Sequence, residues 1–192
     1  MAKACPSRYT SHVVDVPDAV TDWVERLHAA VDACAEPAVA SNAGRLQCRS
    51  GCADCCVDAL TVFGVEAAVI LRHHAELLAT GAPREAGACA FLDAADGCRI
   101  YEHRPYVCRT QGLPLRWFEE DRETGEIIES RDICPRNLEG SPLETLAPDA
   151  CWTIGPFEER LAQRQHALDG LGGRVSLRSL FAADGRRRLP VV

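Results

Sequence analysis

Cysteine is the residue type whose number and spacing in this chain could do chemistry. The sequence holds eleven cysteines in 192 residues, and eight of them fall between residues 48 and 134. The eight are Cys48, Cys52, Cys55, Cys56, Cys89, Cys98, Cys108 and Cys134. Thiolate sulfur is a preferred ligand of zinc and of iron–sulfur clusters, and the ligands of one centre must converge in space. We therefore predict that these side chains bind a metal, with an iron–sulfur cluster or zinc as the cofactor.

The sequence around these cysteines suits metal ligation. Gly51 and Gly97 each precede a cysteine. Glycine lets the backbone turn sharply and expose amide N–H groups, which can hydrogen-bond to metal-bound sulfur. Successive side chains of an extended segment point to opposite faces, so we expect Cys55 and Cys56 to serve different metals. Eight thiolates could supply two four-coordinate ions, or one cubane cluster plus a second site, and counting does not choose between these arrangements.

Two strings of residues give the cysteine cluster a family likeness. Residues 48–56 read CRSGCADCC, and residues 98–109 read CRIYEHRPYVCR. Through these strings, about residues 45–138 resemble the YkgJ-type cysteine-cluster family, also described as the CxxCxxCC putative zinc- or iron-chelating domain. The resemblance implies chelation of zinc or iron in a mostly bacterial family, some of whose relatives are flagellin lysine methylases. The chain has Ala53-Asp54 where many relatives have a glycine before the double cysteine.

Three side chains near the cysteines are predicted to bind the cofactor without ligating it: Tyr101, Arg104 and Arg109. Two divalent ions would neutralise only half the charge of eight thiolates, so guanidinium groups are expected to donate to sulfur. A tyrosine can donate its hydroxyl to a thiolate or cover the cluster with its ring. Metal ions are the predicted partners, and any redox or protein partner stays unidentified.

Two classes of function fit these residues. The first is a metal-binding protein with a structural, storage, sensing or electron-transfer role and no demonstrable catalytic activity of its own. The alternative is an iron–sulfur enzyme, because Cys48-x3-Cys52-x2-Cys55 has the spacing of radical S-adenosylmethionine enzymes. Against the enzyme, too few βα units follow this motif, and no glycine-rich S-adenosylmethionine loop supports a methylase. A zinc-organised interaction module is weaker, since only Cys52-x2-Cys55 has the spacing of a zinc knuckle.

Composition and charge predict where the protein is located and which classes of partner it does not bind. No apolar stretch follows Lys3, so a secretory signal is not expected, and the predicted location is the cytoplasm, where structural disulfides are rare. No apolar run approaches the roughly 20 residues that span a bilayer, which predicts a soluble protein without a membrane partner. The formal net charge of −7 makes nucleic acid an unlikely partner, and Arg186-Arg187-Arg188 is the one basic cluster.

Helices are predicted on both sides of the cysteine cluster. Apolar residues at helical spacing, Val20 to Cys34 among them, indicate a helix over 15–36 that ends before Pro37. A second helix is expected over 65–78, and a third begins near Pro156. Between them, Asp96-Gly97 and Thr124-Gly125 indicate two small β-hairpins.

The predicted fold is therefore α+β: a small, irregular, metal-organised domain with about three main helices around a loop-rich cysteine cluster and one or two short hairpins. We expect one domain over 1–192, with the metal-binding core at 45–138. The helix at 15–36 and a helical segment at 153–183 pack on this core, and 184–192 form a flexible tail.

The cysteines outside the cluster and the histidines beside it are mostly predicted to have structural or surface roles and not to bind metal. Among the cysteines outside the cluster, Cys34 is expected in the core, Cys5 as a bystander and Cys151 in packing beside Trp152. His73 and His74 are assigned structural or surface roles. His103, beside the Arg104-Pro105 turn, has the better claim to assist the cluster.

Overall fold

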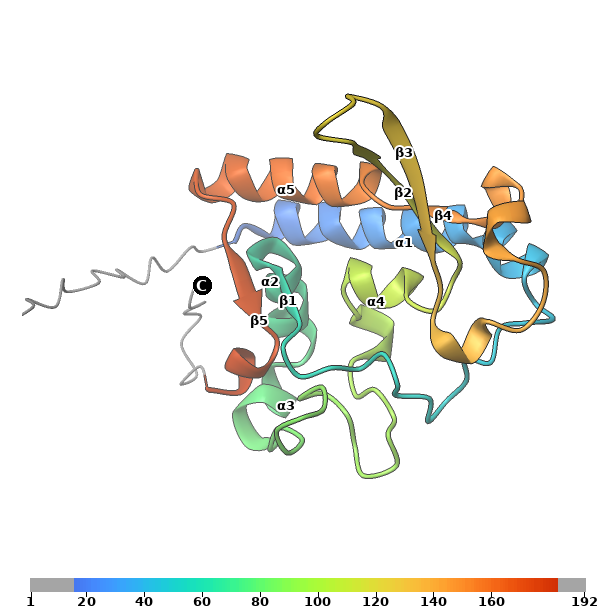
Figure 1. Ribbon diagram of the computed structural model, residues 1–192. Helices are drawn as coiled ribbons and strands as arrows, with labels where there is room; N and C mark the ends of the chain where they lie inside the picture. Colours follow the sequence, from blue (N-terminus) through green and yellow to red (C-terminus); the bar gives the residue numbers. More distant parts are fainter. Residues whose placement is uncertain (1–15, 183–192) are drawn as a thin grey trace, which may run out of the picture.

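The computed structural model describes residues 16–182. Its elements, in chain order, are α1 (Asp18–Ser41), β1 (Thr61–Phe63), α2 (Gly64–His73), α3 (Ala75–Thr80), η1 (Tyr101–His103), α4 (Tyr106–Thr110), β2 (Leu115–Glu120), β3 (Ile127–Asp132), η2 (Pro135–Asn137), η3 (Leu143–Thr145), η4 (Pro148–Ala150), β4 (Trp152–Thr153), α5 (Pro156–Asp169), β5 (Arg174–Ser176) and η5 (Arg178–Ala182). Helices α1 and α5 lie side by side, α2 and α4 pack on α1, and the β2–β3 hairpin projects from the body (Figure 1). The predicted α+β class, with three main helices and small sheets, is confirmed.

Helix α1 is longer than the sequence predicts. It continues through Pro37 to Ser41, whereas the expected helix stops before the proline. Proline removes one N–H and with it one intrahelical hydrogen bond. Ala35 and Ala38, on either side of Pro37, are buried in the core. The predicted end was wrong because packing of this apolar face outweighs the one lost hydrogen bond.

The predicted second helix is two helices. Helix α2 ends at His73 and α3 begins at Ala75, because His74 has the non-helical angles φ −125° and ψ 28°. At this break the His74 ring contacts the ring of His103 on η1. The apolar period continues across the break, so the period alone could not reveal it.

The two sheets join distant parts of the chain. Strand β1 pairs antiparallel with β5, and the second sheet has the order β3-β2-β4, with β2 and β4 parallel. The hairpin predicted around Thr124-Gly125 is confirmed as β2 and β3. The hairpin predicted around Asp96-Gly97 is reduced to one isolated bridge between Leu92 and Cys98.

Two clusters of buried side chains hold these elements together. The first joins α1, α2, α4 and α5, and the second joins α2, α3, β5 and the segment 89–100. Helix α2 contributes to both, with Val65 and Val69 in the first and Ala67 and Ile70 in the second. The cysteine-bearing segment 89–100 is therefore fixed to the helices by the second cluster.

The C-terminal helix follows its prediction closely. Helix α5 begins at Pro156, and Gly170 follows its last residue with the left-handed angles φ 70° and ψ 0°. Glycine adopts this conformation without the steric cost of a Cβ.

No helix in residues 16–182 is long and apolar enough to cross a membrane. Cys5, residue 15, the Arg186-Arg187-Arg188 cluster and the tail predicted at 184–192 lie outside the described residues.

Candidate metal centre

The double cysteine lies in a tight turn. The N–H of Cys56 donates to the carbonyl of Ala53 at 2.8 Å, and the N–H of Val57 donates to the carbonyl of Cys55 at 3.1 Å. The segment is therefore not extended, and the two thiols interact with each other. The alternation of side chains behind the expectation that Cys55 and Cys56 serve different metals is therefore absent, because alternation holds only for extended backbone. Which metal each thiol binds stays a prediction.

A backbone hydrogen bond brings the next cysteine beside this turn. The N–H of Cys89 donates to the carbonyl of Cys56 at 2.9 Å. Cys89 is 8% exposed and belongs to the second core cluster, and Cys56 and Cys98 pack against that cluster. Cys56, Cys89 and Cys98, which come from separate parts of the sequence, therefore lie at the same apolar cluster.

Asp93 holds the turn that leads to Cys98. Its Oδ1 accepts the N–H groups of Gly97 and Ala95, each at 2.8 Å, and these bonds lower the pKa of the Asp93 carboxyl. A Cβ at Gly97 would lie 2.8 Å from Asp93 Oδ2. Glycine is therefore required immediately before Cys98 for the carboxylate to cap this turn.

Cys108 lies on the short helix α4, which a buried carboxylate anchors. Glu66 on α2 accepts the N–H of Tyr106, the first residue of α4, at 2.7 Å. His28 Nε2 on α1 lies 3.1 Å from the same Glu66 oxygen, and both residues are 3% exposed. The contact joins α1, α2 and α4, so α4 and its cysteine are positioned from inside the protein.

Five thiols form one interacting set, the inner group: Cys55, Cys56, Cys89, Cys98 and Cys108. A hydrogen bond with Cys56 lowers the pKa of Cys55 to about 6, and the same contact, with burial, raises the pKa of Cys56. Burial, with the charges of Cys89 and Cys98, raises the pKa of Cys108 to about 12. Burial also raises the pKa of Cys89 and of Cys98. Further thiolates in this group therefore need a cation among them.

Backbone amides face two sulfurs of the inner group. The N–H of Phe91 hydrogen-bonds to Cys89 and that of Ile100 to Cys98, and both bonds oppose the effect of burial on the thiol pKa. Amide groups placed in this way stabilise metal-bound thiolate. The donor set of the inner group thus fits a metal ion or cluster held by sulfur.

The remaining predicted ligands are the outer group: Cys48, Cys52 and Cys134. Arg136, on η2, interacts with the charges of Cys52 and Cys134, and its guanidinium is ion-paired with Asp54. A cation is therefore close to both sulfurs. We expected this role from arginines nearer to the other cysteines. Arg136 was not among them, although it stands two residues after Cys134.

Asn137 ties the outer group to the loop after α4. This residue is fully buried; its Oδ1 accepts the N–H of Gln47 at 2.7 Å, and its Nδ2 donates to the carbonyl of Gly112 at 2.7 Å. Nδ2 also lies 3.5 Å from Cys48 Sγ. A Cβ at Gly112, where φ is 97°, would lie 2.6 Å from the same sulfur. Sequence reasoning had no signal for this residue, because its partners lie in distant segments.

Asn137→Ala is expected to destabilise the fold by about 2–3 kcal/mol and to make Cys48 react faster with iodoacetamide. The change leaves the carbonyl of the buried Gly112 without its donor and removes the acceptor of the N–H of Gln47 in a part-buried hydrogen bond. Urea unfolding and mass-spectrometric labelling measure the two effects. Gln163→Ala is the control, since within residues 16–182 this exposed amide bonds only to Glu159. Equal stability of the two variants would contradict the role assigned to Asn137.

Neither group is a closed coordination sphere as the side chains stand. Within residues 16–182, no three or more His, Cys, Asp or Glu side chains form a group that could hold a metal ion. The structure therefore brings cysteine-bearing segments together, and the ligand set remains a prediction. Ligation requires the cysteine side chains to rotate toward a common centre.

The three predicted cofactor neighbours lie on η1, on α4 and in the turn that joins them. The Arg104 guanidinium covers the ring of Tyr101 at 4.1 Å from its centroid, and Tyr101 is 58% exposed. Arg109 donates to Asp32 at 2.5 Å and to the carbonyl of Glu102 at 2.9 Å. Its buried Nε has no hydrogen-bond partner among residues 16–182. Contact of these three side chains with a cofactor stays a prediction.

Two further cysteines stand apart from both groups. Cys34 is exposed, and its predicted place in the core was wrong, because the buried stripe of α1 runs through Val31 and Ala35 instead. Cys151 is buried beside Arg131, whose Nη1 lies 3.9 Å from the sulfur, and burial raises the pKa of its thiol.

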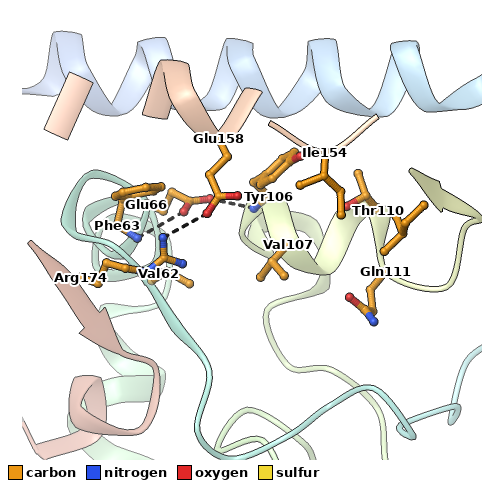
Figure 2. Close-up of a pocket in the computed structure, with 11 residues that line it drawn as sticks. Val62, Phe63, Glu66, Tyr106, Val107, Thr110, Gln111, Ile154, Glu158 and Arg174 are labelled. Carbon is orange, nitrogen blue, oxygen red and sulfur yellow. Dashed lines mark hydrogen bonds and ion pairs between the residues drawn. The ribbon is translucent and has the colours of Figure 1, made fainter. Parts of the chain in front are cut away.

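A pocket of about 150 Å³ opens beside α4 (Figure 2). Glu66 and Tyr106 line it, and Glu158 and Arg174 form an ion pair of 3.3 Å at its wall. Figure 2 shows the Glu66 carboxylate turned toward the start of α4. No cysteine lines this pocket among the described residues, so its importance for the metal centre is indirect, through the position of α4.

A comparison with known protein families gives a match to the segment that carries the cysteines. Residues 47–135 match the model of a protein family described as "CxxCxxCC: Putative zinc- or iron-chelating domain". The matched segment contains all eight predicted ligands. No curated protein and no solved structure matches the chain.

Proposed function

Because residues 47–135 of this chain belong to the CxxCxxCC family, we propose that the protein chelates iron, as an iron–sulfur cluster, or zinc through its clustered thiolates. The inner group supplies the principal ligands, and the outer group completes the centre or holds a second ion. The observation that carries the proposal is the inner group itself, in which five thiols from three segments interact.

The electrostatics of the inner group support a bound cation. Burial and mutual repulsion keep most of these thiols protonated, and a metal ion reverses both effects because it stabilises thiolate directly. The N–H groups of Phe91 and Ile100 already point toward the sulfurs of Cys89 and Cys98, respectively. If these cysteines only filled apolar space, the N–H hydrogen bonds to their sulfurs would have no role.

The exposure of the ligands supports exchange with a partner. Cys55, Cys56 and Cys98 are half-buried rather than enclosed. A centre at the surface suits transfer of an electron or a metal ion, so we propose sensing, storage or electron transfer in addition to structural support. Residues 16–182 form two small sheets and not the repeated βα units of a radical-enzyme barrel, so the described geometry favours chelation over that alternative.

Purification without oxygen is the decisive experiment. An iron–sulfur centre is expected to give a brown protein that absorbs near 400 nm and bleaches with dithionite, with iron and acid-labile sulfide in the elemental analysis. Zinc is expected to give a colourless protein that contains zinc. Either metal in stoichiometric amount supports the proposal. Metal-free protein whose clustered thiols all react rapidly with iodoacetamide in the native state would overturn it.

A further inference from the structure

Three histidine rings meet at the surface between α2 and η1. His73 is the last residue of α2, His74 follows it, and His103 is the last residue of η1. The rings of His73 and His103 stack at 3.9 Å between centroids with an interplanar angle of 9°. The rings of His74 and His103 meet edge to face, at 5.1 Å and 70°. None of these side chains belongs to the cysteine groups.

One nitrogen pair in this cluster has the spacing of a metal chelate. His74 Nε2 lies 3.1 Å from His103 Nδ1. Zinc–imidazole bonds of about 2.0–2.1 Å place two nitrogens about 3.0 Å apart in octahedral geometry and about 3.3 Å apart in tetrahedral geometry. The observed separation lies between these values, so a bound ion requires almost no movement of the two nitrogens. Imidazole is also the ligand that suits zinc, copper and nickel.

The third ring supports the pair without joining it. Imidazole lone pairs lie in the ring plane, and the planes of His73 and His103 are nearly parallel. Lone pairs of two stacked rings do not converge on one ion. His73 is instead held by Glu25, whose Oε1 lies 2.7 Å from its Nε2. Its stacking fixes the orientation of the His103 ring.

The charges around the pair favour the neutral rings that a metal needs. Burial, and then the neighbouring imidazoles, lower the pKa of His74. Burial and the charge of His73 likewise lower the pKa of His103, with Arg109 acting in the same direction and Glu25 and Glu102 against it. Protonation therefore competes little with metal binding at neutral pH.

We propose that His74 and His103 form a two-nitrogen chelate for a late first-row divalent metal ion. The ion completes its coordination sphere with water, and the site is separate from the cysteine cluster. The sulfur ligands suit iron–sulfur clusters or zinc, whereas the histidine pair accepts zinc, nickel or copper in exchangeable form. The site does not depend on whether the cysteines hold iron or zinc.

Nickel(II) is the probe for this site. Full-length protein that keeps the metal with which it is purified is titrated with nickel(II) at pH 7.5 by calorimetry, and release of the original metal is measured in parallel. We expect one nickel ion per chain without release of that metal. His74→Gln and His103→Gln are each expected to weaken binding at least tenfold, and His166→Gln, on the exposed face of α5, to leave it unchanged.

Two further measurements separate ligation from folding. Thermal unfolding without nickel checks that each variant is folded, and paramagnetic broadening of histidine ring signals in the wild-type protein identifies the ligands directly. Binding should weaken only when the pH falls below the ordinary imidazole pKa of about 6.5, because the pKa values of His74 and His103 are both lowered from it. The proposal is overturned if wild-type protein binds no nickel, if both glutamine variants bind as wild type does, or if the broadened signals belong to other histidines.

Discussion

Cys108→Ser is expected to remove at least half of the bound metal and to melt the middle of the chain at a much lower temperature. Cys108 is central to the inner group, since its thiol interacts with those of Cys89, Cys98 and Cys55. A serine hydroxyl stays protonated at neutral pH and does not replace a thiolate ligand. Structural zinc supplies about 10–16 kcal/mol of apparent binding energy in small domains, so loss of the centre should have a large effect on the fold.

The measurements are metal content per chain and thermal unfolding, both on protein purified without oxygen. Cys55→Ser is expected to behave in the same way, because Cys55 shares the inner group. Cys34→Ala is the matched control, as Cys34 is exposed on α1 and distant in sequence from the cluster. Metal stoichiometry that is unaltered in Cys108→Ser and Cys55→Ser would refute their assignment as ligands.

Local sequence patterns predicted the parts of the fold that local forces determine. Helix α5 starts at Pro156 and stops before Gly170, because each residue has the backbone angles that its position requires. The β2–β3 hairpin forms around Thr124-Gly125. The break at His74 and the continuation of α1 through Pro37 were missed, since contacts with distant residues override the local preference there.

Pairing between distant strands had no local signal at all. Strand β5 joins β1, and β4 joins β2 in parallel. Strands β1 and β5 have three residues each, and β4 has two. Such short segments carry no usable hydrophobic period. Their pairing is decided by how the helices pack, which a single sequence does not display.

The candidate site shows the same difference between features that local sequence determines and features that depend on distant contacts. The residue type and spacing identified the cysteines, because thiols so dense in one segment have few other uses. No pattern in the sequence identified the residues that position these cysteines, which are Glu66, Asp93, Asn137 and Arg136. Each acts through a hydrogen bond or ion pair with another segment or through the geometry of a turn. Polar residues of this kind are common in any chain, and only the fold shows which of them are buried and paired.

Glu66→Ala is expected to destabilise the protein by about 2–5 kcal/mol and to weaken the metal centre, although Glu66 is not a ligand. The substitution leaves the N–H of Tyr106 and the ring of His28 buried without their acceptor, and each unsatisfied group costs about 1–3 kcal/mol. Because Tyr106 begins α4, the loss loosens the helix that carries Cys108. The centre should therefore lose metal faster to a chelator.

Two variants separate this positioning role from a general loss of stability. Glu66→Gln keeps an amide oxygen that can accept the N–H of Tyr106, so we expect it to retain the metal at a smaller cost in unfolding free energy. Glu76→Ala removes an exposed carboxylate of α3 and is expected to change neither quantity. Urea unfolding gives the stability, and the rate of metal transfer to a chelator in native buffer gives the second readout. If Glu66→Ala matched Glu76→Ala in both measurements, the buried contact between α1, α2 and α4 would have no part in holding Cys108.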